Sequence, residues 1–139
     1  MSKIIEILRA HEGVETHAYK CTSGKTTIGV GRNIEAGSGP GLSTDEINYL
    51  LASDIERVEA ELLAAFNWYR TLGTARKDAI MDMCFNMGLP RFKKFKKALA
   101  GMAKGDYKTA AIEFLDSRWA NQVGQRAITV TDIIRSGKY

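Results

Sequence analysis

The sequence predicts an α+β fold, in which a small N-terminal hairpin region is followed by a region built only of helices. Three observations support this prediction. Residues 10–33 mix β-branched residues, hydroxyls and glycines, as short strands and turns do. After Leu42 the apolar residues recur at helical spacing. Between the two regions, Ser43 is followed three residues later by Glu46, which is the signature of a helix N-terminus.

Length and composition indicate one ordinary globular domain. The chain has 139 residues, of which 45% are hydrophobic and 26% charged. We expect a single domain over 1–139, with a helix-and-hairpin part at about 1–42, a linking helix at about 43–66 and a helical part at about 67–139. No apolar run approaches the roughly 20 residues that span a bilayer. No secretory signal is visible, so a cytoplasmic location is expected.

Charge and metal-ligating residues narrow the choice of partner only slightly. A formal charge of +4 favours polyanions without naming one. Two cysteines, Cys21 and Cys84, are too few for a disulfide scaffold. Together with His11 and His17 they show no recognisable metal-binding spacing. The sequence therefore predicts neither a metal nor a cofactor.

The first helix is expected over residues 2–12, where apolar residues keep helical spacing. Gly13 suits the end of a helix because glycine accepts a positive φ at no steric cost. Glu12 then lies in the last turn, where the partial negative charge of the helix disfavours an ionised carboxylate. A carboxyl group that keeps its proton is what general-acid chemistry needs.

A β-hairpin is expected next, with strands at 17–21 and 25–31 and a turn at 22–24. On the second strand, Thr27, Gly29 and Gly31 share one face if the strand is regular. That face is small and polar, so a ligand could approach the backbone closely.

Two nucleotide-binding motifs fail on inspection. Gly24-Lys25-Thr26 resembles the end of a phosphate-binding loop, but the required glycine at position 19 is Tyr19. Gly29-Val30-Gly31 would need a glycine at position 34, which is Ile34. A nucleotide cofactor is therefore not expected.

The rest of the chain is expected to be helical, over residues 43–66, 74–87, 91–102, 106–116 and a closing segment that reaches 134. Gly88 should end the second of these helices, and Trp119 should pack in the core. The segment 91–102 is basic and amphipathic, with Lys93, Lys94, Lys96 and Lys97 on one face. Those lysines either lie in water on an ordinary surface helix or form a patch for anionic envelope polymers or lipid.

The order Glu12-Gly13, Tyr19, Cys21, Gly24 and 27–31 resembles the active-site hairpin of phage-type lysozymes, glycoside hydrolase family 24. The family triad is a Glu, eight residues, an Asp or Cys, five residues and a Thr. Here it corresponds to Glu12, Cys21 and Thr27. A second match, at 85–88 and 117–122 with Arg126, resembles the family's helical lobe. The resemblance covers nearly the whole chain in the right order.

The resemblance implies a lysozyme-like fold in which a long helix joins the hairpin lobe to the larger helical lobe. It implies a muramidase that cleaves the β-1,4 bond between N-acetylmuramic acid and N-acetylglucosamine of bacterial peptidoglycan, without a cofactor. Such a protein would act as a monomer and bind no nucleic acid. It would stay in the cytoplasm until a holin-type pore gave it access to the cell wall.

The chemical roles of the triad leave alternatives open. Glu12 is the expected proton donor, or else a helix-end charge that pairs with a nearby base. Cys21 could act as a base on water, as a nucleophile at the anomeric carbon, or only as a small packing residue. The Thr27 hydroxyl either orients a water or satisfies the hairpin.

The resemblance also places Asn33, Phe85, Asn86 and Arg126 at substrate-binding positions. Phe85 and Asn86 could instead serve only to pack the end of their helix. Arg126 would lie beside Glu12 and favour its ionised form.

Two rival functions are compatible with the sequence. A non-enzymatic cationic protein could bind membranes or nucleic acid through residues 91–97, with steep salt dependence and no need for Glu12. A lytic transglycosylase would use one Glu and produce an anhydro sugar instead of a reducing end.

Overall fold

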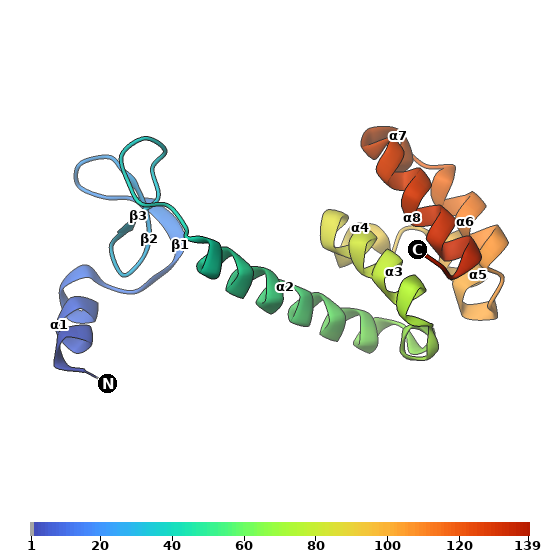
Figure 1. Cartoon of the computed structure of the whole chain (residues 1–139), viewed down its shortest axis with the longest axis horizontal. Coiled ribbons are helices and arrows are strands. Elements are labelled where there is room, and N and C mark those ends of the chain that lie inside the picture. Colours follow the sequence, from blue (N-terminus) through green and yellow to red (C-terminus); the bar gives the residue numbers. More distant parts are fainter. Residues whose placement is uncertain (1) are drawn as a thin grey trace. The chain divides into compact units, whose positions relative to one another are not determined.

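The structure is a computed structural model that describes residues 2–139 (Figure 1). The chain forms two compact units, the first ending at Leu51 and the second comprising Ala52–Tyr139. A small antiparallel sheet belongs to the first unit, and the second unit is helical within the described residues. The predicted α+β, lysozyme-like fold class is confirmed.

The first unit contains helix α1 (Lys3–Glu12) and a three-stranded sheet of order β1-β2-β3. The strands are β1 (Glu15–Lys20), β2 (Thr26–Gly29) and β3 (Arg32–Asn33). Thr27 lies on the central strand, where it pairs with Tyr19 on one side and Asn33 on the other. The sheet therefore holds residue 27 from both sides.

The second strand is shorter than the sequence indicated. It ends at Gly29 instead of continuing to Gly31, and the unpredicted strand β3 pairs back onto it. The reason is local: Gly29 and Gly31 have φ angles of +70° and +65°, which turn the chain away from the extended conformation. The expectation that 27, 29 and 31 share one regular strand face is therefore wrong beyond residue 29.

Helix α2 (Thr44–Ala65) begins with the predicted capping box. The Glu46 N–H donates to Ser43 Oγ at 3.1 Å, and the Ser43 N–H donates to Glu46 Oε1 at 2.9 Å. The Glu46 carboxylate also pairs with Arg32 at 2.8 Å. These bonds hold the start of α2 against strand β3.

The second unit places its helices around one apolar core. They are α3 (Thr74–Met87), α4 (Leu89–Phe92), α5 (Lys96–Lys104), α6 (Tyr107–Leu115), α7 (Arg118–Val123) and α8 (Gln125–Ser136), preceded by the 3-10 helix η1 (Asn67–Thr71). Helix α6 packs between α5 and α8 (Figure 1). Met83, Phe92 and Phe114 are fully buried, and Trp119 is 5% exposed, which confirms its predicted place in the core.

The single helix expected over 91–102 is wrong, because α4 and α5 are separated by a turn at 93–95. In one continuous helix, Lys93 and Lys97 would be neighbours at i,i+4, and Lys94 and Lys97 at i,i+3, where like charges repel. The break also lets Phe92 and Phe95 both pack against Phe114.

No helix within residues 2–139 combines the length and the apolar character needed to cross a bilayer.

Candidate active site

Glu12 is the last residue of α1, as expected. Gly13 follows at a φ of +78°, and its N–H donates to the Arg9 carbonyl at 3.0 Å, which closes the helix end. The Glu12 side chain is exposed and lies against Gly31, in the turn between β2 and β3. A Cβ at residue 31 would be 2.7 Å from Glu12 Oε2, closer than such contacts occur in proteins. The Glu12 carboxyl group is thus in contact with the backbone at Gly31.

Cys21 lies at the turn of the β1–β2 hairpin. The Cys21 N–H donates to the Lys25 carbonyl at 3.0 Å, and the Gly24 N–H donates to the Cys21 carbonyl at 2.8 Å. Gly24 adopts a φ of +79°, which completes a short three-residue loop. The Cys21 thiol lies 3.1 Å from the Ser23 hydroxyl across this loop.

The loop makes the Cys21 thiol acidic. Hydrogen bonding by the Ser23 hydroxyl, then by the backbone at Lys25 and Ser23, lowers the pKa of Cys21 from its usual 9.0 to about 7. The Thr27 hydroxyl adds to this lowering, and partial burial opposes it. More of this thiol is therefore ionised near neutral pH than in an ordinary cysteine, and the thiolate is the form that acts as a base or nucleophile.

Thr27 is buried, with 4% of its surface exposed. Its hydroxyl donates to the Lys25 carbonyl at 2.8 Å, so the hydroxyl proton takes part in a hydrogen bond within the hairpin. The lone pairs of the hydroxyl oxygen still allow it to accept a hydrogen bond from water. The two roles considered for Thr27 are thus compatible with one geometry.

The hairpin region therefore holds three groups with complementary chemistry. Glu12 can donate a proton, Cys21 can accept one near neutral pH, and the Thr27 oxygen can fix a polar molecule beside the thiol. Within residues 2–139, no group of three His, Cys, Asp or Glu side chains is arranged to hold a metal ion.

Sequence reasoning missed a carboxylate that supports this hairpin, Glu35. It accepts hydrogen bonds from the Thr26 N–H at 3.0 Å and from the Thr26 hydroxyl at 2.9 Å, and it pairs with Lys20 at 3.4 Å. These bonds, led by the Thr26 N–H, lower the pKa of Glu35 from 4.5 to about 2. Glu35 thereby fixes the residue next to Thr27, and its distance along the chain from Thr26 left no local signal.

Asn33 also contributes to the local structure. Its side-chain oxygen accepts the Glu35 N–H at 2.8 Å, and its amide nitrogen donates to Ser38 Oγ at 3.3 Å. Gly39 packs so closely on Asn33 that a side chain would not fit there. Asn33 therefore shapes the loop after β3, and its role in substrate binding stays a prediction.

The second unit carries the other expected binding residues. Phe85, near the end of α3, is 41% exposed. Its neighbour Asn86 accepts a hydrogen bond from Trp119 Nε1 at 3.0 Å, which ties α3 to α7. Within residues 2–139 the Asn86 amide nitrogen donates no hydrogen bond to another side chain, so it is available to an acceptor on a ligand.

Arg126 pairs with Asp82 of α3. Its Nε lies 2.8 Å from Asp82 Oδ1, and its Nη2 donates to the Asp82 carbonyl at 3.4 Å. The expected influence of Arg126 on Glu12 stays a prediction, since these contacts all lie within the second unit.

The chain is similar to known proteins over most of its length. A family model described as phage lysozyme matches residues 9–132. The chain is 27% identical to "Probable T4-type lysozyme 2" of Dictyostelium discoideum, over 99% of this chain and 96% of that protein. It is 28% identical to "Endolysin" of Acyrthosiphon pisum secondary endosymbiont phage 1, over 89% of this chain and 83% of that protein. It is also similar to "Pre-baseplate central spike protein Gp5" of Enterobacteria phage T4, 27% identical over 95% of this chain and 27% of that protein.

Proposed function

Because the chain belongs to the phage lysozyme family, we propose that Glu12, Cys21 and Thr27 are its catalytic residues. The chain is a glycoside hydrolase, a muramidase that cleaves the β-1,4 bond between N-acetylmuramic acid and N-acetylglucosamine in bacterial peptidoglycan. The observation that supports the catalytic assignment best is the contact between the Glu12 carboxyl group and Gly31, which brings this carboxyl group to the β2–β3 turn of the sheet that carries Thr27.

In the proposed mechanism, protonated Glu12 gives its proton to the glycosidic oxygen as the bond to the anomeric carbon breaks. A water held by the Thr27 oxygen forms the new bond to that carbon. The Cys21 thiolate takes the proton that this water loses. This scheme inverts the anomeric configuration, whereas direct attack by the thiolate followed by hydrolysis would retain it.

The test of activity is clearing of permeabilised Gram-negative cells. Wild type should clear the suspension, and Glu12→Gln should not, because an amide cannot give a proton to the leaving oxygen. Glu15→Gln is a matched control, since Glu15 is also exposed and starts the neighbouring strand. Equal clearing by wild type and Glu12→Gln would remove the catalytic role of Glu12.

We propose that Phe85, Asn86, Asn33 and Arg126 contact the glycan. The exposed ring of Phe85 and the available Asn86 amide support this role best, because sugars offer both apolar faces and carbonyl acceptors. Asn33 and Arg126 also bind protein groups, so substitutions at these two positions should disturb local structure as well as the glycan contact.

We also propose that the protein is a monomer that stays in the bacterial cytoplasm until a holin-type pore releases it to the cell wall. The endolysin among its relatives supports this proposal. Sedimentation of the purified protein tests the monomer. Expression in a Gram-negative host should cause lysis only when a holin is co-expressed or the inner membrane is permeabilised, and lysis without either would contradict the proposal.

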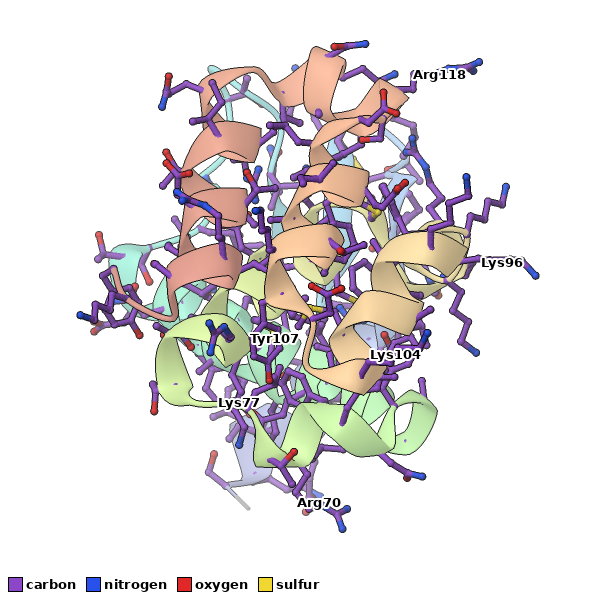
Figure 2. The ribbon with its side chains drawn as sticks, turned by 90° about the vertical axis from the view of Figure 1, so that its right-hand side faces the viewer. Arg70, Lys77, Lys96, Lys104, Tyr107 and Arg118 are labelled. Carbon is purple, nitrogen blue, oxygen red and sulfur yellow. The ribbon has the colours of Figure 1, made fainter. Side chains whose placement is uncertain are left out.

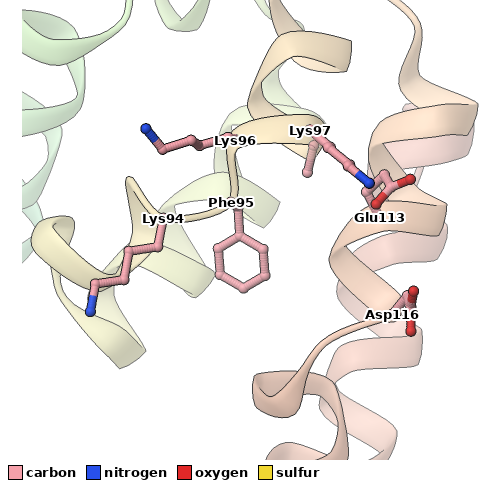
Figure 3. A pocket seen from close by; sticks show the side chains of 7 residues that line it. Lys94, Phe95, Lys96, Lys97, Glu113 and Asp116 are labelled. Carbon is pink, nitrogen blue, oxygen red and sulfur yellow. The ribbon is translucent and has the colours of Figure 1, made fainter.

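A further proposal concerns the lysine cluster, defined as Lys93, Lys94, Lys96 and Lys97. Figure 2 shows Lys96 extending from α5 into solvent. Figure 3 shows a pocket beside these lysines that contains two carboxylates, Glu113 and Asp116. Lys97 points toward Glu113, whereas Lys94 and Lys96 point away from both carboxylates. Within residues 2–139 none of the four lysines lies within ion-pair distance of a carboxylate.

We propose that the lysine cluster contacts negatively charged lipids of the bacterial envelope, where each exposed lysine adds about 1 kcal/mol of attraction. Co-sedimentation with phosphatidylglycerol vesicles should fall when Lys93, Lys94 and Lys96 are changed to Gln. The control variant is Lys108→Gln on α6. Equal sedimentation of both variants would contradict the proposal.

A further inference from the structure

A pocket of about 490 Å³ lies in the second unit where α2 ends and η1 begins, and Ala103 of α5 also lines it. Its lining residues are Ala65, Phe66, Asn67, Trp68, Thr71 and Ala103. None of them is charged, and none was assigned to the proposed catalytic or substrate-binding set. The volume falls within the usual range of small-ligand sites.

The wall of this pocket is aromatic. The rings of Phe66 and Trp68 stack at a centroid distance of 4.9 Å and an interplanar angle of 28°. Phe66 in turn meets the fully buried Phe92 edge-on at 5.8 Å. Both stacked rings are only partly buried, so the pair presents an aromatic surface that the core holds in place.

Two polar groups beside this wall, the Trp68 indole N–H and the Asn67 amide, form no side-chain hydrogen bond within the described residues. Every buried side-chain nitrogen or oxygen within residues 2–139 is hydrogen-bonded, but the Trp68 indole N–H forms no such bond and therefore faces solvent. Asn67 is exposed, and its amide likewise contacts no other side chain by a hydrogen bond within the described residues. The Thr71 hydroxyl already donates to the Trp68 carbonyl at 3.2 Å, so it offers only its lone pairs.

The two tryptophans of the chain differ in their exposure and in the hydrogen bonding of the indole N–H. Trp119 is 5% exposed and donates its indole N–H to Asn86 at 3.0 Å. Trp68 keeps both a partly exposed ring and a free donor. A buried indole with a satisfied N–H serves packing, whereas a partly exposed one with a free N–H can serve recognition.

We propose that the Trp68 pocket, defined as the six lining residues above, is a second glycan-binding site that takes β-1,4-linked N-acetylhexosamine chains. The apolar face of a pyranose packs on the aromatic wall, and the acetamido carbonyl accepts a hydrogen bond from the Asn67 amide or the Trp68 N–H. An uncharged pocket fits an uncharged sugar better than it fits a peptide carboxylate or a phosphate. The choice of glycan rests on the proposed peptidoglycan activity, but binding does not depend on catalysis.

The experiment is titration of the protein with the β-1,4-linked tetramer of N-acetylglucosamine, observed through the indole N–H resonances in NMR spectra. The chain has two tryptophans, so two indole signals are expected, and Trp68→Phe assigns them. The Trp68 signal should shift with saturation, and this shift should persist in Asn86→Asp, because the Trp119 N–H donates to Asn86 at the proposed substrate site. Asn67→Ala should weaken the affinity for the tetramer by about tenfold, because it removes one hydrogen bond to the acetamido carbonyl. Asn67 is exposed, so this variant should fold as wild type does.

Cellotetraose, which lacks the acetamido group, serves as the ligand control and should bind more weakly. A Trp68 signal that stays unmoved by the acetylated tetramer would overturn the proposal. So would equal binding of both tetramers together with an unchanged affinity in Asn67→Ala.

A second measurement separates this site from the catalytic assignment. The double variant Glu12→Gln, Asn67→Ala should be retained less on insoluble peptidoglycan than Glu12→Gln alone. The single variant Asn67→Ala should hydrolyse short soluble fragments at the wild-type rate. If retention falls but wild type releases no reducing ends, the proposed function fails and the glycan site stands. If wild type is active and retention is unchanged, the glycan site fails and the function stands.

Discussion

Glu12 and Gly31 are in contact: the Glu12 Oε2 atom lies 2.7 Å from the position that a Cβ on residue 31 would occupy. The end of the first helix and the β2–β3 turn therefore meet at a point where a side chain on residue 31 would displace the Glu12 carboxyl group. This contact fixes where the proposed proton donor lies relative to the β2–β3 turn.

Gly31→Ala should lower activity by about tenfold to 100-fold, because the added methyl group displaces the Glu12 carboxyl group from its position. It should also cost about 1 kcal/mol of stability, since alanine is strained at a φ of +65°. Gly29→Ala is the matched control: its φ is +70°, but nothing lies within 4 Å of the added Cβ. The two variants should lose similar stability in thermal unfolding, and only Gly31→Ala should lose most of its activity. Equal activities would show that the contact does not position Glu12.

The rate should rise with pH through about 7, because the pKa of the Cys21 thiol is about 7 and only the thiolate accepts a proton from water. Cys21→Asp should move this rising limb to lower pH, since a carboxylate is ionised well below neutrality. Cys21→Ser should lose about 100-fold or more in rate, the usual contribution of a general base. Full activity of Cys21→Ser would leave the sulfur without a chemical role.

Ser23→Ala should move the same limb to higher pH, because the Ser23 hydroxyl is the largest cause of the lowered pKa of Cys21. Thr22→Ala, one position earlier in the same loop, controls for changes in loop structure and should leave the pH profile in place. Coincident profiles of wild type and Ser23→Ala would contradict the assignment of Cys21 as the base.

Acid should destabilise the hairpin region through two carboxylates. The pKa values of Glu35 and Glu46 are both lowered from 4.5 to about 2, by hydrogen bonds led by Thr26 and Arg32 respectively. A lowered carboxyl pKa stabilises the folded state above pH 4.5, and this stabilisation is lost as pH falls toward 2. Glu35→Gln should therefore unfold at lower temperature than wild type at pH 6 and match it near pH 2. Glu15→Gln should follow wild type throughout, and an identical curve for Glu35→Gln would contradict this prediction.

Asn86 offers a way to separate packing from sugar binding. Asn86→Asp keeps an acceptor for Trp119 Nε1 but removes the amide donor, so it should keep its thermal stability and raise KM. Asn86→Leu removes the acceptor as well and should also lower the unfolding temperature. If Asn86→Asp matches wild type in KM, the amide donor has no part in binding.

Local patterns predicted much of the fold because they act over a few residues. Gly13 ends α1, Ser43 and Glu46 open α2, and Gly88 ends α3, each through a contact within one helical turn. The strand end at Gly29 and the break before Lys96 were missed. A glycine in the sequence permits a positive φ but does not require one, so the strand end at Gly29 could not be predicted. The helix break before Lys96 depends on how Phe92 and Phe95 pack in the core, which is a tertiary contact.

The candidate site was predictable as a set of residues but not as a set of contacts. The spacing of Glu12, Cys21 and Thr27 resembles the family triad. The contact of Glu12 with Gly31 is tertiary, whereas the bond between Ser23 and Cys21 is local and depends on the conformation that the loop adopts. Glu35 was missed for the same reason: it reaches back nine residues to Thr26. No pattern of helical or strand period connects two such positions.

The most direct test of the account is mass spectrometry of the muropeptides that the protein releases from purified peptidoglycan. Wild type should yield fragments that end in reducing N-acetylmuramic acid, each heavier by one water than the corresponding anhydro form, and Glu12→Gln should yield none. Anhydro fragments from wild type, or the same reducing fragments from Glu12→Gln, would contradict proton donation by Glu12 to a bond that water then hydrolyses.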